Sequence, residues 1–236
     1  MAVQPANNNV DIIFHEDRLF MAWRTAPTHF ASSDTQLQVV SSTDNGPHWE
    51  LETQLALGDD IREPRFLSLH GKLSLEFFEA GSNPIAFEPK ALWRVERNGR
   101  GRWSEPIKSG DGGEVPWNLK VRGGVAWRSS YSGNHYDLGN VGAGPVYFGG
   151  VSETAFEFDR DGSIWIITRN EDGDASGFGS HLCHAQAGSL GIWNCPAQAS
   201  PERYDSPQMF RHKCFATAMT FISWRDAISA GLMTKV

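Results

Sequence analysis

Two residues of opposite charge, Glu153 and Arg169, stand at the two ends of one predicted hairpin. The segment between them, TAFEFDRDGSIWIIT, alternates apolar and polar residues on either side of an Asp-Gly turn. Both side chains can therefore point to the same face of a sheet. An arginine in such a place stays charged and can bind a carboxylate through two parallel hydrogen bonds. The alternative is that both residues are solvated and make only surface ion pairs, which contribute little to stability.

Two further arginines, Arg24 and Arg62, are candidates for the same role. Arg24 ends the predicted strand RLFMAWR and precedes a polar loop. Arg62 and Arg65 flank Glu63, so a local ion-pair cluster competes with ligand binding at this position. The sequence alone leaves both interpretations open for these arginines.

Asp34 and Tyr131 are candidates on loops. Asp34 lies in SSDT, where a carboxylate can act as a proton donor or simply cap a turn. Tyr131 belongs to SSYSGNHYDLG, a loop whose aromatic rings can stack on sugar faces or serve only a structural purpose. The eight histidines show neither HxH nor HExxH spacing, so we expect no metal site and no cofactor.

Strands must position these residues, because the chain shows no convincing helical periodicity before about residue 205. Short alternating or apolar runs such as VDIIFH, LQVVSS, LSLEFF, ALWRVE and SIWIIT are separated by Gly, Asp or Asn turns. With 9 Trp and 14 Phe among 236 residues, the chain can fill a large aromatic core. We therefore predict an all-β protein.

The strands also repeat in a fixed order. IIFHEDRLFMAWRTA, RFLSLHGKLSLEFFEAG, LKVRGGVAWRSSYSG and AFEFDRDGSIWIITRNEDG each consist of strand, tight turn, strand and polar loop. Second hairpins lie between them, and Trp49, Trp103 and Trp193 end three of these at equivalent places. A repeat of roughly 40–55 residues is typical of one four-stranded propeller blade. The alternative is a β-sandwich of unrelated hairpins.

The segment STDNGPHW fits the pattern S-x-D-x-G-x-x-W through Ser42, Asp44, Gly46 and Trp49. This pattern resembles the Asp-box of sialidases and related β-propellers. Its expected role is structural, because the carboxylate can accept backbone N–H bonds inside the turn while the indole packs between blades. The segment from Glu153 to Arg169-Asn170 also resembles the sialidase pattern E-x-x-x-E, DG, strand, R-N.

The resemblance implies a six-bladed propeller that hydrolyses sialic-acid-type glycosides with retention of configuration. It implies that Asp34 is the acid/base residue and that Glu153 activates a catalytic tyrosine. It further implies that Arg169, Arg62 and Arg24 bind the substrate carboxylate. Tyr131 is predicted as an additional contact to the sugar from the composition of its own loop. A neutral tyrosine suits this chemistry, because a carboxylate nucleophile would be repelled by the acidic substrate.

Departures from the family pattern keep other functions open. The family places an R-I-P motif before the first Asp-box, whereas Arg62-Glu63-Pro64 follows it and Asn7-Asn8-Asn9 occupies the expected place. In the family, the nucleophilic tyrosine lies in the last blades, and no tyrosine of this sequence is a clear candidate for it. One alternative is a non-catalytic propeller that binds carbohydrate or protein. Another is a glycosidase for a neutral sugar, which would use a pair of carboxylates.

The pattern changes after residue 213. We predict a partial propeller of four to five blades over residues 1–213 and an aberrant tail over 214–236 that could form a helix. Codons compatible with residues 217–236 can encode a further strand-turn-strand segment in another reading frame, which favours a frameshift over a genuine helix. A truncated propeller of this kind should be inactive and prone to aggregation.

Charge and composition exclude several other classes. The net charge of −7 argues against a nucleic-acid-binding protein, because phosphate contacts need a basic surface. No apolar run is long enough for a transmembrane helix, and the first residues do not resemble a secretory signal. The three cysteines contain no CxxC pair, so reduced thiols and a cytoplasmic location are the simplest expectation. The sequence does not indicate an oligomeric state.

Overall fold

The structure is a computed structural model that describes residues 3–86, 88–132, 135–138 and 145–200, except for the side chains of 135–138 and 198–200. These residues form strands, turns and loops, and none of the described residues is helical. The all-β prediction is therefore confirmed. Across the described part of the chain, no helix is long and apolar enough to cross a membrane.

The strands form four antiparallel sheets that follow one another along the chain, and we call these sheets blades 1 to 4. Blade 1 contains β1 (Ala6–His15), β2 (Arg18–Ala26), β3 (Gln36–Ser42) and β4 (Glu50–Leu55). Blade 2 contains β5 (Ile61–Leu69), β6 (Lys72–Glu79), β7 (Ala91–Gly99), β8 (Arg102–Trp103) and β9 (Ile107–Asp111). Blade 3 contains β10 (Val115–Arg122), β11 (Val125–Ser132), β12 (His135–Leu138) and β13 (Pro145–Phe148). Blade 4 contains β14 (Thr154–Phe158), β15 (Ile164–Asp174), β16 (Gly177–Ala185) and β17 (Ala197–Ser200).

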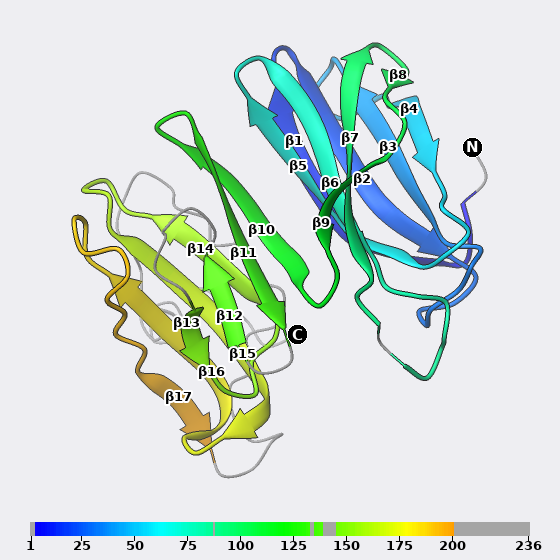
Figure 1. Ribbon diagram of the computed structural model, residues 1–236. Helices are drawn as coiled ribbons and strands as arrows, with labels where there is room; N and C mark the ends of the chain where they lie inside the picture. Colours follow the sequence, from blue (N-terminus) through cyan, green and yellow to red (C-terminus); the bar gives the residue numbers. More distant parts are fainter. Residues whose placement is uncertain (1–2, 87, 133–134, 139–144, 201–236) are drawn as a thin grey trace.

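Each blade is an up-and-down meander in which neighbouring strands pair in sequence order, with β9 added on β7 in blade 2. Blades 1 and 2 lie together, and β10 and β11 of blade 3 connect them to blade 4 (Figure 1). Short turns such as Glu16-Asp17, His70-Gly71 and Gly123-Gly124 join the first two strands of blades 1, 2 and 3. The hairpins predicted from the sequence repeats are thus present.

Three apolar clusters fill the junctions between successive blades. The first joins blades 1 and 2 through residues such as Phe20, Leu37, Phe66 and Phe77. The second joins blades 2 and 3 through Phe78, Leu92, Val115 and Trp117, and the third joins blades 3 and 4 through Val146, Phe156, Ile164 and Ile166. Burial of these side chains provides the main favourable free energy for stacking the blades.

A disulfide joins Cys183 of β16 to Cys195, which precedes β17. The expectation that these thiols are reduced was therefore wrong. The pairing depends on the antiparallel contact of His184 with Asn194, which brings the two Cα atoms to 4.0 Å. Cys214 and the tail predicted over 214–236 lie outside the described residues.

Candidate functional site

The first strands of the blades begin, and the second strands end, at one face of the molecule. Three of the first strands contain a bulge near this face. The irregular registers span Asn8 to Asp11, Arg62 to Arg65 and Pro116 to Asn118, and each contains one residue more than the partner strand. Asn9 and Glu63, inside two of the bulges, have φ values of 53° and 49°. A bulge turns the side chain of its extra residue away from the regular alternation, which is common beside functional sites.

A chain of polar contacts at this face links blades 1, 2 and 3. The Asn9 Nδ2 atom donates a hydrogen bond to Glu63 Oε1, and Arg65 Nη2 lies 2.6 Å from Glu63 Oε2. Arg65 also donates through Nε to the Trp117 carbonyl, and its guanidinium lies 5.2 Å from the centre of the indole ring. Glu63 and Arg65 are buried, so this ion pair holds blades 1, 2 and 3 together beneath the face.

Tyr131, at the end of β11, lies among carboxylates from two blades. Its ring centre is 6.1 Å from that of Trp117. Burial raises the pKa of the Tyr131 phenol, and the negative charges of Glu63, Glu153 and Glu171 raise it further, while Arg169 acts in the opposite direction. The hydroxyl therefore stays protonated and can donate a hydrogen bond to a carboxylate or a ligand.

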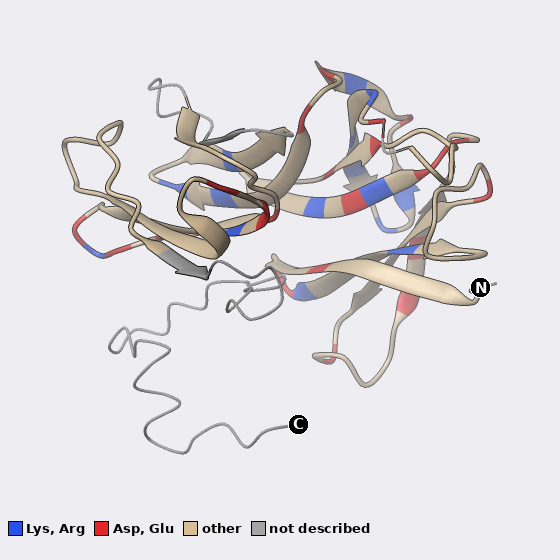
Figure 2. Cartoon of the chain, turned by 90° about the horizontal axis from the view of Figure 1, so that it is seen from below, with Lys and Arg blue, Asp and Glu red and all other residues tan. Residues whose placement is uncertain are grey.

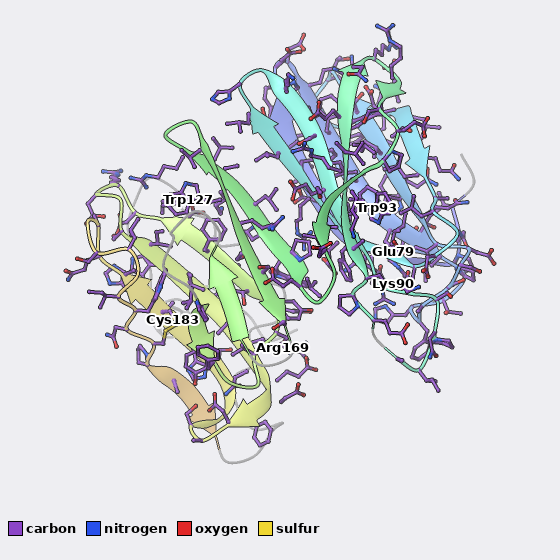
Figure 3. The ribbon with its side chains drawn as sticks, in the orientation of Figure 1. Glu79, Lys90, Trp93, Trp127, Arg169 and Cys183 are labelled. Atoms are coloured by element: carbon purple, nitrogen blue, oxygen red, sulfur yellow. A yellow bond between two sulfur atoms is a disulfide. The ribbon has the colours of Figure 1, made fainter. Side chains whose placement is uncertain are left out.

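Glu153 and Arg169 meet at the start of blade 4, as the sequence predicts. The Arg169 backbone N–H donates to the Glu153 carbonyl at 3.1 Å, and Arg169 Nη1 lies 3.8 Å from Glu153 Oε1. Arg169 Nη2 makes a closer ion pair with Glu171 Oε1 at 2.8 Å. Figure 3 shows Arg169 on the right-hand side of blade 4, toward the middle of the molecule. Its side chain is 14% exposed, so a ligand could reach it from solvent.

Arg24 has a different environment from the one predicted. Its side chain is 0% exposed, and Nε and Nη2 lie 3.0 and 2.8 Å from Asp60 Oδ1. Nη2 also donates to the Phe30 carbonyl at 3.0 Å. Burial lowers the pKa of Arg24, while the Asp60 charge opposes this shift. These donors bind groups inside the protein, so Arg24 has a structural role. The prediction that it contacts a substrate carboxylate is corrected accordingly.

Arg62 shares the same buried carboxylate. Its Nε lies 2.5 Å from Asp60 Oδ2, and its Nη2 donates to the His29 carbonyl at 3.3 Å. Arg62 and Arg24 therefore hold the loop between β2 and β3 from two sides, through one aspartate that the sequence analysis did not single out. The Arg62 side chain remains 19% exposed.

Asp34 lies on that same loop and is exposed. Its backbone N–H donates to Ser32 Oγ at 3.2 Å, and its carbonyl accepts from Gln4 Nε2 at 2.7 Å. These contacts are those of a turn residue. An acid/base role for Asp34 stays a prediction.

The turn that contains Ser42, Asp44, Gly46 and Trp49 connects β3 and β4, away from this face. Ser42 Oγ donates to Asp44 Oδ1 at 2.7 Å and accepts from Gly46 N at 2.9 Å, while Asp44 Oδ1 accepts from His48 N at 3.1 Å. The hydrogen bonds from Ser42 and His48 lower the pKa of Asp44. All these bonds close the turn itself.

A second polar cluster holds the loop between β6 and β7. Lys90 Nζ lies 2.6 Å from Asp59 Oδ2, and the Trp93 indole donates to Glu79 Oε2 at 3.0 Å (Figure 3). In the view of Figure 2, basic and acidic residues are interspersed along the strands.

Sequence reasoning found Glu153, Arg169 and Tyr131 but missed Glu63 and Glu171 as their neighbours. Glu171 was within reach of the sequence, because it lies two residues after Arg169 on the same strand and so on the same side of the sheet. Glu63 depends on the bulge in β5, which periodicity does not reveal.

Comparison with known proteins finds no matching family and no matching curated relative. Solved structures do match. The Bacteroides ovatus xyloglucan PUL protein GH43B has 17% identity and a TM-score of 0.54, over 83% of this chain and 41% of that one. The exo-β-1,3-galactanase of Phanerochaete chrysosporium has 8% identity and a TM-score of 0.55, over 81% of this chain and 50% of that one. The Trypanosoma rangeli sialidase has 11% identity and a TM-score of 0.52, over 80% of this chain and 37% of that one.

The fold is that of a β-propeller. The four blades of the described residues fall within the four to five that were predicted. The three matching propellers are glycoside hydrolases, and this chain spans half of their length or less. At such low identity the match establishes the architecture of the propeller and leaves its activity open.

Proposed function

We propose that the face around Tyr131 binds a carbohydrate and that it derives from the active site of a propeller glycoside hydrolase. The observation that carries this proposal is the meeting of Tyr131 with the charges of Glu63, Glu153, Glu171 and Arg169, which come from two different blades. Protonated phenols, carboxylates and guanidiniums supply the donors and acceptors that orient sugar hydroxyls. The fold of known propeller glycosidases supports the same proposal.

The more specific proposal is a sialic-acid-type sugar as the substrate. Arg169 and Arg62, which are partly exposed, would bind its carboxylate. Tyr131 would attack the anomeric carbon and transfer its phenolic proton to Glu153, while Asp34 protonates the leaving oxygen. Water would then release the sugar from Tyr131. In this scheme Tyr131 is the nucleophile. The sequence had offered no candidate for that role in the last blades.

A glycosidase for a neutral sugar is the second candidate, because the arginines of this face already have acidic partners. Asp60 binds Arg62, Glu63 binds Arg65, and Glu171 binds Arg169. A substrate carboxylate would have to compete with these groups, whereas a neutral sugar would not. In that case two of the glutamates would serve as the acid and the nucleophile.

Calorimetric titration of the 236-residue chain with a sialic-acid transition-state mimic and with a neutral iminosugar tests both candidates. Binding of the acidic mimic that Arg169→Ala weakens at least about tenfold supports the sialoside proposal, since a bidentate contact is worth more than 1.4 kcal/mol. Arg100→Ala is the matched control, because Arg100 forms an exposed pair with Glu50 in blade 1. Binding of the iminosugar alone would favour the neutral-sugar glycosidase.

Assays with fluorogenic glycosides then separate an enzyme from a binding protein. Sugar binding without hydrolysis would identify a non-catalytic propeller. Failure of both ligands to bind, in a chain that unfolds cooperatively, would falsify the proposal for this face.

A further inference from the structure

One face of blade 1 is apolar across the whole sheet, although no described blade covers it. The registers place Ile12 opposite Met21, Met21 opposite Val40, and Val40 opposite Leu51. This row crosses all four strands. It lies on the side opposite Phe20, whose side chain belongs to the cluster between blades 1 and 2, because successive residues of a strand point to opposite faces.

The exposure of β1 distinguishes it from the first strands of the other blades. Val10, Ile12 and Phe14 alternate along β1 and are 51%, 46% and 57% exposed. On β5, in contrast, Phe66 and Leu67 are buried, although they point to opposite faces of the sheet. Along the row that crosses the sheet, Leu51 is also 51% exposed, whereas Val40 is only 3% exposed. Exposed apolar side chains grouped on one face of a sheet are typical of an interaction surface. We call the face formed by Val10, Ile12, Phe14, Met21 and Leu51 the blade 1 seam.

Junctions within the chain show what kind of surface fits such a seam. Strands β1 and β2 of blade 1 pack on β5, and strands β10 and β11 of blade 3 pack on β14. Each blade thus places its downstream face, the face toward the next blade in the chain, against the first strand of that blade. Apolar side chains fill these junctions. The surface that matches the blade 1 seam is therefore the downstream face of another blade.

Blade 4 carries such a downstream face at the other end of the arc. Ile167 pairs with Ala155 on β14 and with Leu182 on β16, so the three side chains form an apolar row. This row lies on the side opposite Ile166, which belongs to the cluster between blades 3 and 4. Ile167 and Leu182 are half-buried, and so is their neighbour Trp165.

We propose that the 236-residue chain associates head to tail with a second copy of itself, the downstream face of blade 4 docking on the blade 1 seam of its partner. The contact repeats the blade-to-blade packing that is already present three times within the chain. Because the two surfaces are different, the interface is heterologous. It either closes into a ring, if the rotation allows, or continues into longer assemblies.

Light scattering coupled to size-exclusion chromatography tests the association over a wide range of concentrations. The wild-type mass should rise with concentration above the 26.2 kDa of one chain. Ile12→Asp and Phe14→Asp place a charge in the contact and should weaken the association at least about tenfold, as for a central interface residue. Both positions are exposed in one chain, so these variants should keep the unfolding midpoint of the wild type at concentrations where the wild type is monomeric.

Ile107→Asp is the matched control, because Ile107 on β9 is 48% exposed and lies outside the seam. It should associate as the wild type does. A chain that stays at 26.2 kDa at every concentration would overturn the proposal. An association that Ile12→Asp and Phe14→Asp leave unchanged would overturn it equally.

Cysteine cross-linking tests the head-to-tail direction. Ile12→Cys and Ile167→Cys are prepared as separate proteins, each with Cys214→Ser to remove the third cysteine. The mixture should form a covalent dimer under mild oxidation, and neither protein alone should do so. A dimer from Ile12→Cys alone would show that two seams face each other, and the head-to-tail arrangement would then be wrong.

Discussion

Arg24 in blade 1 and Arg169 in blade 4 occupy matching places in the first hairpins of their blades, but they have different surroundings. Arg24 is completely buried against Asp60, a carboxylate that comes from the connection into blade 2. Arg169 lies between Glu153 and Glu171 of its own hairpin and keeps 14% of its side chain exposed. The position in the blade therefore does not decide the role of the arginine. The carboxylate supplied by the neighbouring segment does.

The third and fourth strands of the two blades differ in a similar way. In blade 1, hydrogen bonds among Ser42, Asp44 and His48 hold the turn between β3 and β4. In blade 4, the disulfide between Cys183 and Cys195 holds the outer strands together. Blade 1 therefore relies on a buried ion pair and a hydrogen-bonded turn, and blade 4 relies on a covalent bond.

Removal of the Asp60 charge should have the largest effect on stability. Asp60→Asn leaves the Arg24 guanidinium buried without a counter-charge, so we expect a loss of about 3–5 kcal/mol in the free energy of unfolding. Urea denaturation measures this loss. Arg169→Gln is the comparison in blade 4 and should cost less than Asp60→Asn, because the side chains of Arg169 and Glu171 keep 14% and 33% of their surface exposed. Equal losses for both variants would contradict the comparison of the two arginines.

Loss of the disulfide should have the next largest effect. Cys183→Ala with Cys195→Ala opens a loop with a sequence separation of 12, for which we expect a cost of about 3 kcal/mol. In the wild type, the difference between the thermal unfolding midpoints with and without a reductant measures the same loss of stability. A thiol titration of the denatured, unreduced protein should find only Cys214. Three reactive thiols would show that the bond does not form.

Gly46→Ala should weaken the turn of blade 1 by a smaller amount. The φ of Gly46 is +109°, a conformation that side chains with a Cβ rarely adopt, so we expect a loss of about 1–3 kcal/mol. Gly188→Ala provides the control in blade 4, where φ is +80° and no atom lies near the added Cβ. A larger loss at Gly188 than at Gly46 would mean that the turn of blade 1 is not the more constrained of the two.

Acid should weaken blade 4 by a smaller amount still. Burial lowers the pKa of His181 from its usual value of 6.5, while Asp174 opposes the shift. The unfolded chain then binds a proton that the folded chain does not, so stability falls as the pH decreases below about 6.5. His181→Gln should reduce the decrease of the unfolding midpoint between pH 7 and pH 5. An unchanged pH profile in this variant would exclude His181 as the cause.

The alternation of residues predicts the strands well, because each blade packs one face of every strand into a junction. The runs VDIIFH and LQVVSS lie in observed strands, and so does SIWIIT apart from Ser163. Glu153 and Arg169 could be placed together for the same reason, since a two-stranded hairpin fixes which residues share an edge. The packing of Arg24 could not be foreseen, because Asp60 lies 36 residues further along the chain. Long-range contacts of this kind depend on how the blades stack.

The disulfide also could not be predicted from the sequence alone. The spacing of Cys183 and Cys195 permits a hairpin contact, but a short sequence separation is equally compatible with two cysteines on different faces. Only the pairing of His184 with Asn194 brings them together. The ion pair of Glu63 with Arg65 was foreseen as one alternative. The position of Glu63 beside Tyr131 was missed, because the bulge in β5 changes the direction of its side chain and periodicity assumes a regular strand.

The three bulges have a consequence for how the blades relate to one another as repeats. Each inserts one residue near the start of the first strand, and in all three the regular pairing resumes at the same distance from the turn, at Asp11, Arg65 and Asn118. Deletion of that residue would move the beginning of the strand by one place and exchange its inner and outer side chains. From the end of the bulge to the turn, the first three blades therefore match residue by residue, and a search for internal duplication needs no gap across these segments. The described pairing of β14 with β15 in blade 4 shows no such shift.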